Sequence, residues 1–340
     1  MLSFKPTDRS HHSHGSTHAN KQHGTGREDK QSGSMQDSVS LSGSTANGRQ
    51  GVGGEVYQSF PGRTGYDENF LGIKLPMPQL DGSIQNQAAP LLADPSQIEL
   101  KYTHFSTVQN KDRATPMLTA VNIDGAQFRE FERKGTWAFD SRIAREHQMG
   151  NEAYSNNPID KGHQVRRKDP MWGADAENGS GDTFVYTNAG LQHSDLNQKP
   201  WLDVENNVLN GAVALHEKKT VFTGPILRDD DPTFNNGGKM LRPTKMPQAF
   251  WKVEVWNEPG QGLQSEAFVV SQKDLYGKEQ SHVPYEHIKP MDFKNYRVTM
   301  SQLEDMTHIH FGDLKEGADR TVSDAKAAAA AGIGGGGQEG

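Results

Sequence analysis

The sequence predicts an α+β fold, a mixed domain around an antiparallel sheet with disordered tails at both ends. Three observations lead to this prediction. Short segments rich in β-branched and aromatic residues recur through the middle of the chain, and only two segments have the apolar spacing of a helix. Both ends of the chain are poor in large apolar residues. Dominant strands with inserted helices are typical of the α+β class.

The strands are predicted from β-branched and aromatic content, and one of them also from alternation. AFWKVEVWNE (249–258) alternates apolar and polar residues, as expected of an antiparallel strand with one face exposed. The other strands are expected at 102–110, 117–124, 182–188, 220–226 and 266–271. Before them, residues 56–100 contain GYDENFLGIKLPMPQL (65–80), whose apolar residues are separated by Gly and Pro. We expect residues 56–100 to form an extended arm packed on a domain at 101–318.

Two helices are predicted. The first begins after Asn197, where Pro200 suits an opening turn, and its apolar residues fall on one face: Trp201, Val204, Val208 and Leu215. The second is expected at 301–307, where Ser301 and Glu304 have the spacing of a capping box.

The two ends of the chain do not have the composition of a packed core. Residues 1–55 are rich in Ser, Gly, His, Gln, Asn and Thr, and residues 319–340 contain an Ala run followed by Gly. Such segments bury too little apolar surface to offset their chain entropy, so we expect both to be disordered. The five His residues of the N-terminal tail suggest a weak metal tether, although a plain flexible tail is the preferred interpretation.

Composition also limits the function. The chain has no Cys, which excludes disulfides, thiolate metal sites and a Cys nucleophile. It has no signal-peptide core and no segment near the roughly 18–20 apolar residues that span a bilayer, so we expect a soluble protein with no membrane partner. It would be cytoplasmic or exported by a specialised route. The net charge of −7 argues against a protein that coats nucleic acid, but a nuclease needs only a local cationic cleft.

The first motif that carries chemistry is DKGHQVRR (160–167). His163 is the candidate general base, because a neutral imidazole is abundant at neutral pH and can take a proton from water. Lys161, Arg166 and Arg167 are candidate phosphate-binding cations. Asp160 would orient the strand end or accept a hydrogen bond. Taken alone, each of these residues also has an ordinary interpretation as surface charge or a structural ion pair.

The second motif is SDLNQKPWLDVE (194–205). Asn197 offers a neutral carbonyl oxygen of the kind that Mg²⁺ prefers, with Mn²⁺ as a possible substitute. Glu205 follows just over two helical turns later and would hold a water of the ion. Upstream of both motifs, Arg133 and Arg142 are further candidates for binding substrate. A capping Asn and a solvated Glu are the ordinary alternatives for the second motif.

These motifs resemble those of the DNA/RNA non-specific endonucleases, the ββα-metal or His-Me finger family that includes Serratia-type nuclease and endonuclease G. The resemblance covers roughly residues 64–315. It rests on DKGH for the family's DRGH, and on the stretches GHQVRRKDPMWG, TNAGLQHSDLNQKPW and WAFDSRI. It implies a ββα-metal motif at the active site of the α+β domain. It also implies a Mg²⁺-dependent, sugar-non-specific endonuclease that leaves 5′-phosphate ends on DNA and RNA.

The resemblance implies roles for individual residues. His163 corresponds to the general base, Asn197 to the direct metal ligand and Glu205 to the residue that holds the waters of the ion. Arg133, with Arg142 as its rival, corresponds to the phosphate-binding Arg. The implied partners are nucleic acid and an inhibitor or immunity protein, and the family includes homodimers.

Three departures from the family pattern leave every chemical role in place. Lys161 replaces the usual Arg and loses its bidentate fork, Leu191 stands where Pro is frequent, and Val204 replaces Leu. Three alternatives stay open: a nuclease toxin delivered to rival cells, an inactive nuclease-like domain that binds nucleic acid or protein, and a metal-binding scaffold based on the His-rich tail. The complete set of His163, Asn197 and Glu205 favours an active enzyme.

Overall fold

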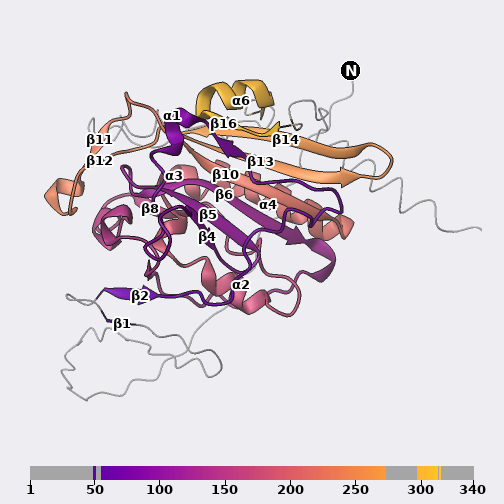
Figure 1. Ribbon diagram of the computed structural model, residues 1–340, viewed down its shortest axis with the longest axis horizontal. Helices are drawn as coiled ribbons and strands as arrows, with labels where there is room; N and C mark the ends of the chain where they lie inside the picture. The colour runs from indigo at the N-terminus through magenta and orange to yellow at the C-terminus, as the bar shows by residue number, and fades with distance from the viewer. Residues whose placement is uncertain (1–48, 51–54, 273–296, 313, 315–340) are drawn as a thin grey trace, which may run out of the picture. The chain divides into compact units, whose positions relative to one another are not determined.

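A seven-stranded antiparallel sheet forms the centre of the protein (Figure 1). The structure is a computed structural model that describes residues 49–50, 55–272, 297–312 and 314. The strand order is β15-β14-β13-β10-β6-β5-β4. The long strands are β6 (Thr115–Asp124), β10 (Lys218–Ile226), β13 (Ala249–Glu258) and β14 (Gly262–Ser271). The shorter ones are β4 (Glu99–Lys101), β5 (Phe105–Asn110) and β15 (Arg297–Val298).

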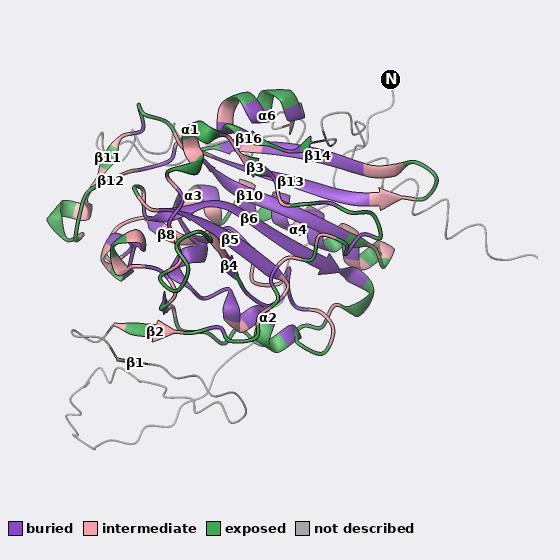
Figure 2. Ribbon diagram, in the orientation of Figure 1, coloured by how far each residue is buried: buried purple, intermediate pink, exposed green. Residues whose placement is uncertain are grey.

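Both faces of the sheet are covered, and its strands are therefore buried over most of their length (Figure 2). One face packs against helix α4 (Pro200–Leu215), whose apolar side chains contact Val121 and Val221 near one end and Phe250 near the other. The other face packs against helix α6 (Met300–Thr307) and against Phe70 of the segment that precedes the sheet. The side chain at position 252 of β13 lies on the α4 face, because successive strand residues alternate between faces.

Smaller elements surround this sheet. The short strands are β1 (Arg49–Gln50), β2 (Val56–Gln58), β3 (Gln79–Leu80), β7 (Phe139–Asp140), β8 (Ile159–His163), β9 (Ala189–His193), β11 (Thr233–Phe234), β12 (Thr244–Lys245) and β16 (Ile309–His310). The short helices are α1 (Gly82–Gln85), α2 (Ala176–Asp182) and α3 (Ser194–Asn197). Single 3-10 turns are η1 (Gly125–Gln127), η2 (Arg145–His147), η3 (Asn151–Ala153), η4 (Tyr186–Asn188) and η5 (Asn236–Gly238).

The predicted α+β class is confirmed. The strands expected at 102–110, 117–124, 220–226, 249–258 and 266–271 correspond to β5, β6, β10, β13 and β14. The helix expected after Asn197 is α4, with Pro200 in its first turn and Trp201, Val204 and Val208 buried. The exposed face expected for 249–258 is wrong, because β13 is buried on both sides: Phe250 packs with α4, and Trp251 and Val253 pack with α6.

The strand expected at 182–188 is wrong. Helix α2 ends at Asp182 and η4 occupies Tyr186–Asn188. Buried polar side chains hold this path: Asp182 accepts a bond from Thr103 N, and Asn188 bonds both N and O of Val165. The helix near residue 301 is present, but Thr299 and Gln302 form its capping box, and Glu304 instead accepts from Phe311 N at 2.8 Å.

The predicted tails at 1–55 and 319–340 lie outside the described residues, apart from Arg49, Gln50 and Glu55. The boundaries expected at residues 100 and 318 remain predictions. In the described part of the chain, no helix has both the length and the apolar composition needed to cross a membrane.

Candidate active site

The DKGH motif and the NQKPW motif meet in a strand–strand–helix arrangement. Strand β8, which ends at His163, pairs antiparallel with β9, and α3 and α4 follow β9 directly (Figure 1). Local propensity did not predict β8 or β9, since they contain Asp, Lys, Gly and Gln rather than β-branched runs, and only the family resemblance implied a ββα motif here. Their pairing is nevertheless what brings two motifs that are distant in sequence into one site.

Asn197 is attached to the strand that carries His163. Its Nδ2 donates to Oδ2 of Asp160 at 2.9 Å, and Nε2 of Gln198 donates to the same oxygen at 2.9 Å. A carboxylate only accepts hydrogen bonds, so this contact identifies the amide nitrogen of Asn197 and leaves its carbonyl oxygen available for a cation. Asp160 and His163 are three residues apart on β8, about 10 Å along an extended strand.

His163 lies in an aromatic and cationic environment. Its ring centroid is 4.9 Å from that of Trp137 and 5.3 Å from that of Phe184, and the guanidinium of Arg133 lies 5.5 Å from the Phe184 ring. The residue as a whole is half-buried, but its Nε2 atom has no solvent contact and no hydrogen-bond partner. Burial first, then the charges of Arg133 and Arg167, lower the pKa of His163 to about 3. The imidazole is therefore neutral, with a free lone pair, at neutral pH.

Lys161 projects beside this imidazole. Its Nζ donates to Oδ1 of Asn151 at 2.8 Å and lies 5.3 Å from the ring of Tyr154 and 6.0 Å from that of Trp137. Burial lowers the pKa of Lys161, and the charge of Asp160 opposes that shift. Lys161 is thus a cation on the same strand as the candidate base, and its ammonium group lies near the rings of Tyr154 and Trp137.

Gly162 lets the side chain of Gln192 lie close to the backbone of β8. A Cβ placed on Gly162 would lie 1.9 Å from Oε1 of Gln192, a buried residue of β9. Any side chain at position 162 would therefore displace the side chain of Gln192.

Glu205 is buried beneath α4. It is only 8% exposed, its Oε1 has no hydrogen-bond partner, and its Oε2 lies 3.9 Å from Nε of Arg166. Burial raises the pKa of Glu205 to about 7; the charge of Lys252 opposes this most strongly and that of Asp169 reinforces it. Glu205 is therefore not the solvated helix residue of the ordinary alternative.

The four candidate arginines have different positions. Arg133 is exposed and Arg167 is half-buried, and the charges of both act on His163. Arg166 braces α4, with Nη1 donating to the backbone oxygen of Glu205 at 2.9 Å. Arg142 is not brought to the site: its guanidinium binds the fully buried Asp140 at 2.6 Å and lies 4.8 Å from the ring of Tyr102.

Sequence reasoning missed Lys252, Asp169 and Trp137. Lys252 gave no signal, because it alternates with Trp251 and Val253 and so falls on the face of the strand that is expected to be exposed. Asp169 and Trp137 lie in the stretches RRKDPMWG and WAFDSRI that carried the family resemblance, but nothing in their spacing indicated their contacts.

The residues of this site fit a magnesium ion better than a transition metal. Among the described residues, no three His, Cys, Asp or Glu side chains are grouped as a metal site. Mg²⁺ keeps several waters and takes only one or two protein oxygens, whereas Zn²⁺ prefers three or four His or Cys ligands. The carbonyl oxygen of Asn197 and the unpartnered carboxylate oxygen of Glu205 are hard donors of the required kind.

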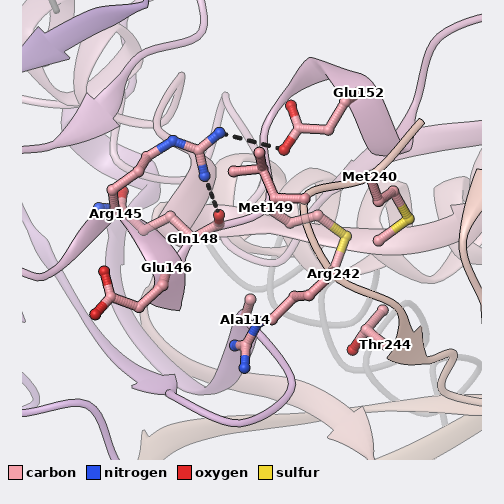
Figure 3. Close-up of a pocket in the computed structure, with 10 residues that line it drawn as sticks. Ala114, Arg145, Glu146, Gln148, Met149, Glu152, Met240, Arg242 and Thr244 are labelled. Carbon is pink, nitrogen blue, oxygen red and sulfur yellow. Dashed lines mark hydrogen bonds and ion pairs between the residues drawn. The ribbon is translucent and has the colours of Figure 1, made fainter. Parts of the chain in front are cut away.

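A hollow of about 160 Å³ lies elsewhere, between residues 145–152 and 240–244 (Figure 3). Arg145 crosses one side of it, donating to the backbone oxygen of Gln148 at 2.7 Å and to Glu152 at 3.2 Å. None of the predicted site residues lines this hollow. We therefore place the candidate site at β8, β9 and α3, where the DKGH and NQKPW motifs meet.

Comparison with known proteins agrees with this architecture. The model of the DNA/RNA non-specific endonuclease family matches residues 85–317. The uncharacterized protein y4fB of Sinorhizobium fredii (strain NBRC 101917 / NGR234) is 34% identical over 279 residues, which is 76% of this chain and 40% of that protein. The chain thus spans less than half the length of that curated relative.

A solved structure shares the fold. It is described as the crystal structure of the EndoG/EndoGI complex and the mechanism of EndoG inhibition, and it aligns with a TM-score of 0.50 and 16% identity. The alignment covers 64% of this chain and 86% of the solved one. On the match of the family model to most of the folded region, the chain belongs to the DNA/RNA non-specific endonuclease family.

Proposed function

We propose that this protein is a Mg²⁺-dependent, sugar-non-specific endonuclease that hydrolyses phosphodiester bonds of DNA and RNA to 5′-phosphate ends. One observation carries the proposal. A neutral His163 with an unpartnered buried nitrogen lies beside two arginines, on the strand that anchors Asn197 through Asp160. Family membership supports the same reaction class.

His163 is the general base in this proposal. Because its pKa is lowered to about 3, the imidazole is neutral at pH 7, and its unprotonated ring nitrogen can accept a proton from the attacking water. A base with so low a pKa is weak in the free protein. Burial is the main cause of this low pKa, and Arg133 and Arg167 add to it, so a phosphate bound between the arginines would remove their contribution and raise the basicity of His163 in part.

The cations beside His163 bind the scissile phosphate. Arg133 is exposed and suited to bidentate contact with phosphate oxygens, and Lys161 projects from the same strand as His163. Arg167 donates to the backbone oxygen of Phe131 at 3.3 Å, so it supports the segment that carries Arg133 while adding positive charge. Contacts of this kind bind the phosphates of the nucleic acid and not its bases, so the proposed cleavage has no sequence preference.

Asn197, through its carbonyl oxygen, and Glu205, through water, would hold the magnesium ion. When bound, the ion supplies positive charge that stabilises the phosphorane-like transition state and the departing 3′ oxygen. Asp160 orients the Asn197 amide and thereby fixes which atom faces the ion.

Plasmid nicking tests the proposal. The wild-type protein should convert supercoiled DNA to open circles and degrade single-stranded RNA in magnesium, with both activities abolished by chelator and restored by Mg²⁺ or Mn²⁺. The products should carry 5′-phosphates that a ligase accepts. Binding to nucleic acid without cleavage at any metal concentration would favour the inactive nuclease-like domain instead.

A protein inhibitor is a proposed partner. The solved relative with the same fold is an EndoG chain in complex with EndoGI, described as its inhibitor complex. An active nuclease endangers the nucleic acid of the cell that makes it, so an inhibitor or immunity protein suits both the enzyme and the toxin interpretation. A pull-down from the native host that yields a stoichiometric protein and blocks nicking would support this partner, and a protein that binds without affecting cleavage would not.

A further inference from the structure

Asn151 lies beside the candidate active site, at the end of the Lys161 side chain. It is an exposed residue of η3, and its Oδ1 accepts a hydrogen bond from Nζ of Lys161 at 2.8 Å. Lys161 and His163 are two residues apart on β8, so their side chains lie on the same face of the strand. Both lie near the ring of Trp137. Asn151 therefore contacts the cation that lies next to the candidate base.

The contact with Lys161 determines which way the Asn151 amide points. An ammonium group only donates hydrogen bonds, so the atom that faces Lys161 is the carbonyl oxygen of the amide. The amide nitrogen, Nδ2, is then directed away from Lys161. In the described part of the chain, no acceptor pairs with this nitrogen, and the side chain that carries it is exposed. Asn side chains with a free N–H group commonly donate to phosphate oxygens of nucleic acids.

The turn that carries Asn151 is held in place by a distant part of the chain. Nδ2 of Asn236, in η5, donates to the backbone oxygen of Glu152 at 2.7 Å and to that of Ser155 at 3.0 Å. Asn236 has a φ of +41°, a left-handed conformation that Asn adopts more readily than most residues. The two N–H groups of one amide thus fix the end of η3.

The side chain of Glu152 fixes the start of the same turn. Its Oε1 accepts from the backbone nitrogen of Gly150 at 3.1 Å and from Nη2 of Arg145 at 3.2 Å (Figure 3). A side chain that binds a ligand is most effective when the backbone beneath it is rigid. The contacts on both sides of Asn151 therefore set its position before any substrate binds.

Asn178 on helix α2 provides the contrast. It is exposed like Asn151, but its Nδ2 donates to Oδ1 of Asp175 at 3.4 Å. Among the described residues, no cation makes a hydrogen bond with the Asn178 amide. Asn178 is therefore a surface amide with a local contact, whereas Asn151 pairs with a cation of the candidate site.

We propose that Asn151 is a substrate-binding residue, whose Oδ1 holds the ammonium group of Lys161 and whose Nδ2 donates to the same phosphate. The inference rests on the proposed function, since Lys161 binds the scissile phosphate there. An ammonium group lacks the planar fork with which a guanidinium binds two oxygens of one phosphate. Lys161 and Asn151 together present two neighbouring donors to a phosphate, from two side chains joined by one hydrogen bond.

The first test measures binding without cleavage. The fluorescence anisotropy of a short labelled single-stranded DNA, titrated with protein in the presence of chelator, gives the affinity. Asn151→Ala should weaken binding by about 5–20-fold, the lower range for a hydrogen bond to a charged group, since the site is open to solvent. Asn178→Ala should bind within about twofold of wild type, as expected of a surface substitution elsewhere. Melting temperatures show that both variants are folded.

The variant Asn151→Asp separates the two roles of the amide. Aspartate keeps an oxygen that can hold Lys161, but it has no donor, and its negative charge repels a phosphate. Asn151→Asp should therefore bind DNA more weakly than Asn151→Ala does. Asn178→Asp adds the same charge elsewhere and should have the smaller effect. Wild-type binding by Asn151→Asp would mean that Asn151 acts only on Lys161, and it would overturn the proposal that Nδ2 binds phosphate.

A double-mutant cycle tests the link between Asn151 and Lys161. In the Lys161→Ala background the amide is no longer held, so the additional loss of affinity caused by Asn151→Ala should be at least about threefold smaller than in wild type. In magnesium, kcat/KM for cleavage should show the same pattern. Losses that multiply fully would mean that the two residues act separately, and they would contradict the inference.

The failure of this inference can be distinguished from the failure of the proposed function. Wild-type binding and cleavage in both Asn151→Ala and Asn151→Asp would overturn the inference and leave the nuclease proposal in place. The expected pattern of binding, in a protein that cleaves neither DNA nor RNA with any metal, would support the inference and contradict the proposed function.

Discussion

The surroundings of His163 and those of Glu205 shift the pKa values of a base and an acid in opposite directions, and burial is the main cause at both residues. Burial favours the neutral form in both: the pKa falls to about 3 at His163 and rises to about 7 at Glu205. Their neighbours differ. Arg133 and Arg167 both push His163 further in the direction set by burial, whereas Lys252 and Arg166 oppose burial at Glu205.

This difference indicates two kinds of control. His163 is kept neutral mainly by burial, and a phosphate that screens Arg133 and Arg167 would remove only the smaller part of the shift in its pKa. Glu205 is poised near neutral pH, where a small change in its surroundings changes its charge. The surroundings of His163 suit a base that acts on bound substrate. Those of Glu205 suit a carboxylate whose charge, and so whose affinity for a metal ion, changes with pH.

The largest expected effect is at the base. We expect His163→Ala to lower the cleavage rate by about 10²–10⁴-fold, the range for losing a general base. The fold should persist, since Nε2 of His163 has no hydrogen-bond partner to lose. Single-turnover cleavage of a defined duplex measures the rate, and circular dichroism controls for folding. Turnover near the wild-type rate in a folded sample would remove His163 from the mechanism.

The next effect distinguishes two arginines. Arg133→Ala should reduce kcat/KM about 10–100-fold, as expected when a charged contact to the reacting group is lost, with little change in stability because the side chain is exposed. Arg142→Ala should instead destabilise the fold by about 3–5 kcal/mol, because it leaves the buried Asp140 unpaired. Urea denaturation and steady-state kinetics on both variants separate these outcomes. The reverse pattern would restore Arg142 as the phosphate-binding residue.

The pH dependence of cleavage should follow the ionisation of Glu205 rather than that of His163. Glu205 acts as a carboxylate, so protonation below its pKa of about 7 should lower the rate as the pH falls through neutrality. His163, with a pKa of about 3 in the free protein, should contribute no acid limb above pH 5 to kcat/KM. A pH–rate profile of wild type at saturating magnesium measures this. A limb that persists at the same pH in Glu205→Gln would assign it to another group.

The smallest expected effect is on stability, and its sign follows from linkage. The raised pKa of Glu205 means that the folded state binds more protons than the unfolded state between pH 4.5 and about 7. Stability is therefore lost as the pH rises through that window. Glu205→Gln removes this penalty and should stabilise the protein at pH 8 by on the order of 1–3 kcal/mol. Urea denaturation should show the gain shrinking to nothing by pH 4; a destabilised variant at pH 8 would contradict the shift.

Elements that bury a periodic apolar face were predictable, as β10, β13 and α4 illustrate. Strands β8 and β9 could not be predicted from local propensity, because their sequences, IDKGH and AGLQH, contain no run of β-branched or aromatic residues. The motif pattern led to His163 and Asn197. The motif pattern did not distinguish Arg133 from Arg142, since only the tertiary structure shows that the guanidinium of Arg142 is paired with Asp140. Lys252 was missed because a buried Lys in an alternating strand reads as exposed.

The central claim is that a neutral imidazole at position 163 takes the proton of the attacking water. Chemical rescue tests it most directly. Replacing His163 with Gly should abolish nicking in magnesium, and added imidazole should restore it in proportion to the concentration of the neutral form, whereas an equal concentration of a non-basic analogue should not. Full cleavage by His163→Gly without imidazole would contradict the account.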